Sequence, residues 1–148
     1  MPFISITRLR VRSARFLPAF ALHTLRSIRQ ARGAAGFHGG ALLVDRGRTF
    51  WTLTTWDAQD SMRGYMSAGA HRLAMPHLLD WCDEASVAHW TQPEDTLPSW
   101  GEVDRRMRES GRPSKVRHPS PQHAIMSFSR PRPLSAASIK PTPAVEVH

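Results

Sequence analysis

Before Pro93 the spacing of apolar residues switches between the period of a β-strand and that of a helix. The order of these switches constrains the fold more than any other feature of this sequence. In residues 2–10 the side chains alternate between two sets, which predicts a β-strand. In the stretch that follows, apolar residues recur at steps of four, four and three. We therefore expect an amphipathic helix that begins near Phe16 or Leu17 and ends at Gly33. The apolar stripe of this helix consists of Leu17, Ala21, Leu25 and Ile28.

The next segment predicts a β-hairpin. Residues 36–56 contain two β-rich runs on either side of the stretch from Asp45 to Arg48. Gly47 can adopt the left-handed conformation that a tight hairpin turn needs. We therefore expect two antiparallel strands joined at this glycine.

Two helical pieces and a strand complete the pattern. Asp57 is in place to cap a helix over residues 58–67. A second helical piece covers "HRLAMPHLLDWC", residues 71–82, and we expect a break at Met75–Pro76. Residues 84–92 then predict a strand that ends before a proline.

The predicted order is β-α-β-β-α-β, the ferredoxin-like arrangement of an α+β protein. It has a four-stranded antiparallel sheet with helices on one face. On the other face, Trp51 (or Phe50), Trp56 and His89 would point to solvent. A twofold dimer that packs two such sheets together would cover these side chains, so we expect a homodimer through the sheet face.

The composition changes near Pro93, and nearly all bulky apolar residues come before it. We therefore expect a domain over residues 1–92 and a C-terminal extension over residues 93–148. One short helix is predicted at about 99–110, because Ser99 can cap it and Gly111 can end it. After about Arg112 the chain is rich in proline and has no apolar period, which predicts a disordered, mobile tail.

Charge and composition narrow the class of protein. The net charge of +8 would be compatible with binding to nucleic acid. The arginines are scattered, however, and no basic stretch alternates with aromatic residues, so we expect no nucleic-acid partner. No apolar run is long enough to span a membrane, and the first residues do not read as a secretory signal. The single cysteine fits a reducing compartment, so a cytoplasmic location is expected.

Several motifs carry a resemblance to a known family. They are "RFLP.F" from Arg15, "GFHGG" from Gly36, "FWTLTTW" from Phe50, "GAHRLAMPHLLDWCDEAS" from Gly69 and "HPSP" from His118. The chain resembles the dimeric α+β barrel superfamily of antibiotic-biosynthesis-monooxygenase-like proteins, and within it small bacterial proteins related to spheroidene monooxygenase. The superfamily includes cofactor-free oxygenases, haem-binding monooxygenases, haem-degrading enzymes and members without a known reaction. The resemblance therefore implies a monooxygenase-like protein with no cofactor or with haem, and it leaves the chemistry open.

The segment from His71 to Cys82 holds the main candidate for a functional residue. His71 and Met75 are four residues apart, so a regular helix places them on one face. His71 is interpreted as a buried packing residue, a catalytic base or substrate contact, or a haem ligand, with Met75 as a second haem-ligand candidate. His77 lies six residues from His71, and Cys82 has no partner cysteine, so no metal site is expected. The expected packing residues of this segment are Met75, Leu78, Leu79, Trp81 and Cys82.

The dense aromatic residues suggest either core packing or an aromatic-lined pocket for an apolar or aromatic small molecule. The pocket candidates are His38, Trp51, Trp56, Arg72 and His89. The acids at the end of the second helix, among them Asp80 and Asp83, are expected to be solvated or paired with local arginines such as Arg72. Two functions follow: a monooxygenase-like enzyme that uses this pocket, or a non-catalytic dimer that binds a hydrophobic ligand or haem.

Overall fold

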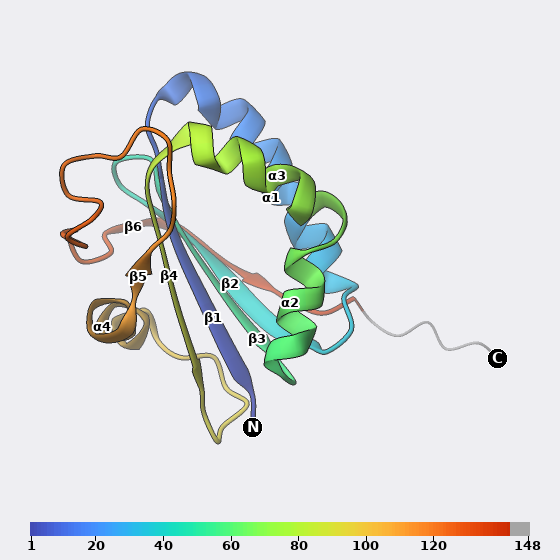
Figure 1. Cartoon of the computed structure of the whole chain (residues 1–148). Helices are drawn as coiled ribbons and strands as arrows, with labels where there is room; N and C mark the ends of the chain where they lie inside the picture. Colours follow the sequence, from blue (N-terminus) through green and yellow to red (C-terminus); the bar gives the residue numbers. More distant parts are fainter. Residues whose placement is uncertain (143–148) are drawn as a thin grey trace.

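A computed structural model of the chain describes residues 1–142 (Figure 1). Its strands are β1 (Phe3–Val11), β2 (Phe37–Asp45), β3 (Thr49–Trp56), β4 (Cys82–Thr91), β5 (Arg112–Pro113) and β6 (Pro133–Ile139). Its helices are the 3-10 turn η1 (Ala14–Phe16), α1 (Leu17–Arg32), α2 (Gln59–Met66), α3 (Gly69–Trp81) and α4 (Trp100–Ser110). The α+β class and the antiparallel sheet are confirmed.

The sheet has six strands in the order β5-β4-β1-β3-β2-β6, and every neighbouring pair is antiparallel. The four central strands have the ferredoxin-like order. The prediction of a four-stranded sheet is wrong, because the C-terminal extension adds one strand at each edge. At the β2 edge, Leu43 of β2 lies opposite Ala136 of β6.

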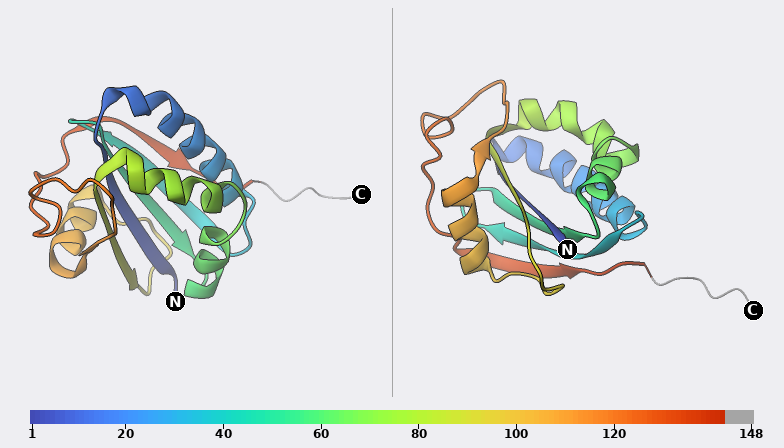
Figure 2. Two further views of the ribbon diagram at one scale, coloured as in Figure 1. Left: turned by 45° about the horizontal axis from the view of Figure 1, so that its top comes forward. Right: turned by 60° about the horizontal axis from the view of Figure 1, so that its bottom comes forward.

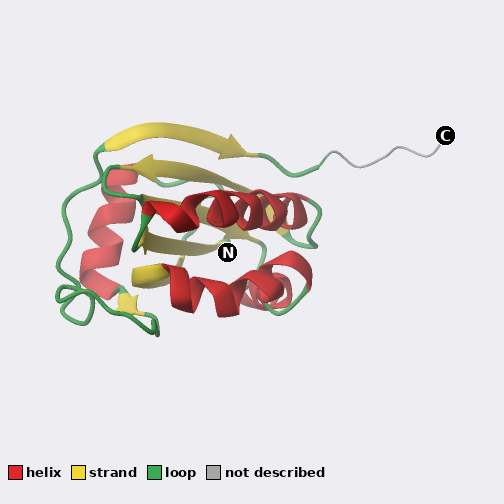
Figure 3. Ribbon diagram, turned by 90° about the horizontal axis from the view of Figure 1, so that it is seen from above, coloured by secondary structure: helices red, strands yellow, loops and turns green. Residues whose placement is uncertain are grey.

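Helices α1, α2 and α3 cover one face of the sheet (Figures 1 and 3). Helix α1 ends at Gly33 as predicted, but only part of the predicted stripe faces inward: Leu17 and Ile28 pack against the core, and Leu25 does not. Leu25 is 65% exposed, whereas Phe20 and Ala31 are buried. The apolar spacing thus predicted the helix correctly, and half of the predicted stripe lies on its inner side. The helix is 16 residues long, and no helix within residues 1–142 is long and apolar enough to cross a membrane.

The structure has two separate helices in this region, as predicted, but the predicted break at Met75–Pro76 is wrong. Helix α3 continues through Pro76. The chain leaves helical geometry only between α2 and α3, where Ala68 is extended, with a φ of −130°, and Gly69, the first residue of α3, has a φ of 55°. Pro76 is exposed, so the helix carbonyl that loses its partner can bond to water. The predicted cap is also wrong: Asp57 caps no backbone group of α2 and instead accepts the hydroxyl hydrogen of Ser61.

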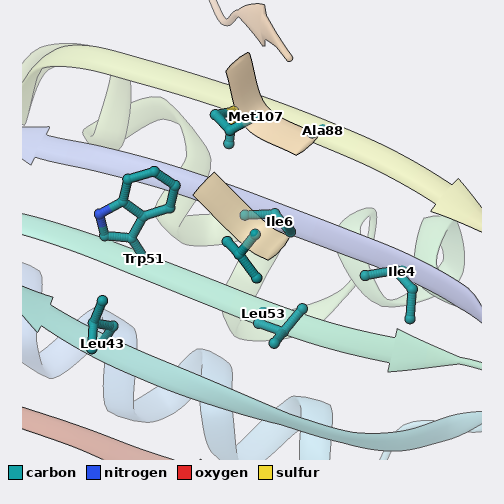
Figure 4. Packing of buried hydrophobic residues seen from close by; sticks show 8 residues of the cluster. Ile4, Ile6, Leu43, Trp51, Leu53, Ala88 and Met107 are labelled. Atoms are coloured by element: carbon teal, nitrogen blue, oxygen red, sulfur yellow. The ribbon is translucent and has the colours of Figure 1, made fainter. Parts of the chain in front are cut away.

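The second face of the sheet is covered by this chain itself. Helix α4 lies on the side opposite α1–α3 (Figure 1), and its Val103 and Met107 pack against Ile6 and Trp51 of the sheet (Figure 4). Trp51 is completely buried, and its indole N–H donates to Asp45 at 3.1 Å. The exposed aromatic face that motivated a homodimer is therefore absent. A partner sheet could reach Trp51 only by displacing α4, and the homodimer stays a prediction.

The described residues beyond α4 add a strand at each edge of the sheet, β5 beside β4 and β6 beside β2 (Figure 2). The guanidinium groups of Arg8 and Arg108 lie over the ring of Phe128, at 4.6 and 4.4 Å from the ring centre. Asp45 accepts the backbone N–H of Arg132 at 2.7 Å just before β6 begins. The prediction of a disordered tail is wrong for residues 112–142. Residues 143–148 lie outside the described part, and the domain division at residue 92 stays a prediction.

The acids around the start of β4 pair with arginines of β1 rather than with Arg72. Arg10 makes ion pairs with Asp83 at 2.7 Å and with Glu84 at 2.8 Å, and Arg8 reaches Glu84 at 3.1 Å. The antiparallel register places Arg10 directly opposite Glu84, which brings the opposite charges together. These acids stabilise the β1–β4 pairing and do not form a catalytic pair of carboxylates.

Candidate functional site

A cavity of about 460 Å³ lies between the sheet and the helices that cover its first face. Helices α1 and α3 form two walls, and residues 112–116 form a third beside β4. The apolar lining residues include Leu9, Phe20, Ile28, Met62, Met66, Ala74, Leu78, Val87 and Val116. A volume of this size in a mostly apolar enclosure is typical of a small-molecule site.

The floor of the cavity is a set of small hydroxyl side chains. Ser5 of β1 lies opposite Thr54 of β3, and Thr7 lies opposite Thr52. The Thr54 hydroxyl accepts the indole N–H of Trp56 at 2.9 Å. The sequence analysis assigned these hydroxyl side chains to no pocket, although they recur at i and i+2 in both strands. They place polar groups at the base of a mostly apolar pocket.

His71 lies near the start of α3 and is fixed from α1. The helix begins after Ala68, whose side chain cannot cap it. Gln30 of α1 supplies the cap: its amide oxygen accepts the backbone N–H of His71 at 2.8 Å. The same amide group donates to the carbonyl oxygens of Tyr65 and Ala68, at 3.0 and 2.7 Å. One glutamine therefore locks the α2–α3 junction and the histidine on it.

The imidazole of His71 is oriented with one nitrogen available. Its Nδ1 lies 3.2 Å from the carbonyl oxygen of Met66, so Nδ1 carries the hydrogen and donates it. Nε2 has no hydrogen-bond partner within residues 1–142. Burial lowers the pKa of His71, and the bond to Met66 opposes this only in part. At neutral pH the ring is therefore uncharged and Nε2 is a free base or metal ligand.

His89 of β4 lines the same cavity. Its ring lies 5.3 Å from that of Phe3, and its pKa is lowered by burial and then by the charges of Arg112 and Arg63. Met75 also lines the cavity but is 39% exposed, so its predicted burial is wrong. The structure thus brings His71, Met75 and His89 together around one space.

The other predicted pocket residues lie elsewhere. Trp51 faces α4 on the opposite side of the sheet. Trp56 is buried against Phe37 and Tyr65 and does not line the cavity. His38 pairs with Asp95 at 2.9 Å on the surface, and Arg72 is exposed on α3.

Sequence reasoning missed four functional candidates. Tyr65 lines the cavity, and its hydroxyl donates to the carbonyl oxygen of Ser27 at 3.1 Å while its ring lies 4.8 Å from that of His71. His23 of α1 lines it as well. Arg112 and Lys115 reach it from the extension, and no local pattern could have indicated that, because the contact joins segments far apart in the chain.

Stability should fall as the pH drops below 6.5, the ordinary pKa of histidine. The pKa values of His71 and His89 are lowered in the folded protein, so between those values and 6.5 the unfolded chain binds more protons. The stabilisation is complete above 6.5 and is lost as the pH falls toward the folded pKa. Urea unfolding at pH 7.5 and 5.5 measures this. His71→Leu should lose less stability over that interval than the native chain, and an equal loss would contradict the assignment.

Cys82 should resist thiol reagents in the folded protein. It is fully buried at the start of β4, and burial, followed by the charge of Asp83, raises the pKa of its thiol to about 12. Because the thiolate is the reactive form, labelling by iodoacetamide at pH 8 should proceed only after unfolding. Rapid labelling without denaturant would show that Cys82 is accessible.

No protein-family model matches this chain, and no curated protein matches its sequence. Solved structures match its fold. A candidate antibiotic biosynthesis monooxygenase from Nitrosomonas europaea has a TM-score of 0.58 at 13% identity, with 64% of this chain and 93% of that chain covered. Rv0793 from Mycobacterium tuberculosis has a TM-score of 0.57 at 12% identity, covering 64% and 97%. A variant of SnoaB, a cofactor-independent oxygenase from Streptomyces nogalater, has a TM-score of 0.53 at 18% identity, covering 66% and 98%.

The chain is thus structurally similar to antibiotic-biosynthesis-monooxygenase-like α+β proteins. Identities this low show the fold alone, and a fold does not fix a reaction. About a third of this chain has no counterpart in each of these three structures.

Proposed function

We propose that this protein is an oxygenase that takes a flat, apolar or aromatic small molecule into the cavity between the sheet and helices α1 and α3. One observation carries the proposal: an uncharged histidine with a free Nε2 lines a largely apolar cavity of about 460 Å³. The hydroxyl floor offers hydrogen bonds to an oxygen atom of the bound molecule.

His71 acts as the base in this proposal. Oxygenation without a cofactor needs a substrate that forms a stabilised carbanion, and the protein supplies a base and a water-poor pocket. The Nε2 atom takes a proton from carbon, and the electron pair stays on the substrate. The bond from Nδ1 to the Met66 carbonyl stabilises the imidazolium that forms. The carbanion then reduces dioxygen and is itself oxidised.

Anthrone is a suitable test substrate, because loss of a ring proton gives a delocalised carbanion. With one dioxygen it yields anthraquinone and one water, which balances the reaction. Oxygen consumption and anthraquinone formation should exceed the buffer rate with the native protein. His71→Leu should remove this excess, whereas Arg46→Gln at the hairpin tip should keep it. Equal rates with and without the protein would refute the oxygenase proposal for this class of substrate.

Haem binding is a second candidate, favoured by the same free Nε2 atom. His71 would hold the haem iron through Nε2, and haem would supply the activation of dioxygen. Met75 is four residues further along the same helix and also lines the cavity, so the two side chains lie on the same side of the cavity and His71 alone would hold the iron.

Absorbance after addition of hemin tests this candidate. A shifted Soret band that disappears in His71→Ala but persists in Met75→Leu would support ligation by His71. A spectrum identical to that of free hemin would exclude it.

Within residues 1–142, no group of three or more His, Cys, Asp or Glu side chains is placed to hold a metal ion.

A further inference from the structure

The cavity described above has a strongly one-sided charge. Its lining contains two cations, Arg112 and Lys115, and three histidines, but no aspartate or glutamate among the described residues. Neither Arg112 nor Lys115 makes an ion pair with a carboxylate in residues 1–142. The lining therefore carries positive charge that no neighbouring side chain neutralises.

Both cations lie in the same wall and at its exposed side. Arg112 and Lys115 are exposed, whereas the floor residues on β1 and β3 lie beneath the helices. The charge of Arg112 is also felt at His89 inside the cavity, where it adds to the effect of burial in lowering the pKa. The cations are thus placed at the mouth, next to water, and the apolar walls lie deeper.

The wall that carries them is held in place. Arg112 lies opposite Val87 of β4, and the backbone N–H of Ser114 donates to the Ala85 carbonyl at 2.8 Å. His123 bridges the same two segments: its Nδ1 accepts the N–H of Ala85 at 3.3 Å, and its Nε2 donates to the Ser114 carbonyl at 2.8 Å. A bond on each ring nitrogen fixes the tautomer, so this histidine is a positioning residue for the charged wall.

We infer that the ligand of this cavity is an organic anion: an apolar or aromatic body that enters the cavity, with a carboxylate or sulfonate group that stays at the mouth beside Arg112 and Lys115. This inference rests on the proposed function and adds the charge of the substrate. Placing the anion at the mouth avoids the cost of burying it, while charge-assisted hydrogen bonds to the two cations favour it over a neutral analogue.

Two fluorescent dyes with the same body separate charge from shape. 1-Anilinonaphthalene-8-sulfonate is an anion, and N-phenyl-1-naphthylamine is its neutral counterpart. The anionic dye should bind the native protein about tenfold more tightly than the neutral dye at low salt, with the difference shrinking as salt is added. The double variant Arg112→Gln/Lys115→Gln should weaken binding of the anionic dye about tenfold and leave the neutral dye within about twofold.

Two further variants show where the dyes bind and whether net charge alone explains the result. Thr52→Phe fills the cavity from its floor with a residue that suits a β-strand, and it should weaken both dyes. Arg46→Gln removes one positive charge at the hairpin tip, outside the cavity lining, and should change neither dye.

The outcomes distinguish this inference from the proposed function. If the neutral dye binds as well as the anionic one and is lost in Thr52→Phe, the cavity is a ligand site but the anion inference is overturned. If removing both cations leaves the anionic dye unchanged, the inference is equally overturned. If Thr52→Phe weakens neither dye, both the inference and the proposed ligand site fail.

Discussion

Ending the chain at Pro121 is expected to lower the free energy of unfolding by about 3 kcal/mol or more. The removed segment contains Met126 and Phe128, which pack against the cluster around Trp51 and are themselves partly buried. Fully buried methionine and phenylalanine side chains typically contribute about 2–5 kcal/mol each, and half of that is reasonable here. The truncation also removes strand β6 from the edge of β2 and the Arg132 N–H from Asp45.

Urea unfolding followed by far-UV circular dichroism measures this loss. Phe128→Ala alone should account for a large part of it. Ile125→Ala is the matched control, because Ile125 lies in the same segment but is 72% exposed and should change the stability by less than about 0.5 kcal/mol. A truncated chain with the midpoint of the full chain would show that the extension does not stabilise the sheet.

Trp51→Ala is expected to cost about 3–5 kcal/mol, which is comparable to the whole stability of many domains. The side chain is completely buried among Ile6, Leu43 and Met107 (Figure 4), so its removal leaves a cavity that these neighbours can fill only in part. It also leaves a carboxylate oxygen of Asp45 without the indole donor.

Two variants separate these effects. Trp51→Phe keeps most of the volume and loses the indole N–H, so it should cost about 1–3 kcal/mol. Leu25→Ala truncates an apolar residue that is 65% exposed and should cost less than about 0.5 kcal/mol. If Trp51→Ala unfolded at the same urea concentration as Leu25→Ala, the structure of the α4 side would be wrong.

The central fold could be predicted because its signals are local. The period of two in β1, the period of 3.6 in α1 and the stop at Gly33 each act within a few residues. The same signals could not show which helices cover each face of the sheet. Alternation places Trp51 and Leu53 on one face, but only the tertiary structure shows that α4 packs there.

The prediction of a disordered C-terminal tail was wrong for a related reason: no local signal indicates strand β6. Residues 133–139 read "PLSAASI", with small side chains that are mostly exposed, so no apolar period indicates a strand. Strand β6 is held to β2 by backbone hydrogen bonds, which depend little on side-chain type.

Half of the candidate site could be predicted from the types of residue in the sequence. His71 and His89 stand out as polar residues in apolar segments, and the structure brings them to one cavity. Arg112 and Lys115 lie far along the chain in a stretch that resembles a tail, and only the pairing of β5 with β4 brings them to it. The role of His71 as a base stays a prediction.

Proton abstraction by His71 can be measured directly by hydrogen–deuterium exchange of anthrone in D₂O under nitrogen, where no oxidation follows. The native protein should accelerate exchange at the acidic ring carbon, and His71→Leu should reduce the acceleration about 100-fold or more. Trp51→Phe, on the other face of the sheet, should retain it. Because burial lowers the pKa of His71, the midpoint of the decline in exchange with falling pH should lie below 6.5. Exchange at the buffer rate, or exchange undiminished in His71→Leu, would contradict the assignment of His71 as the base in this cavity.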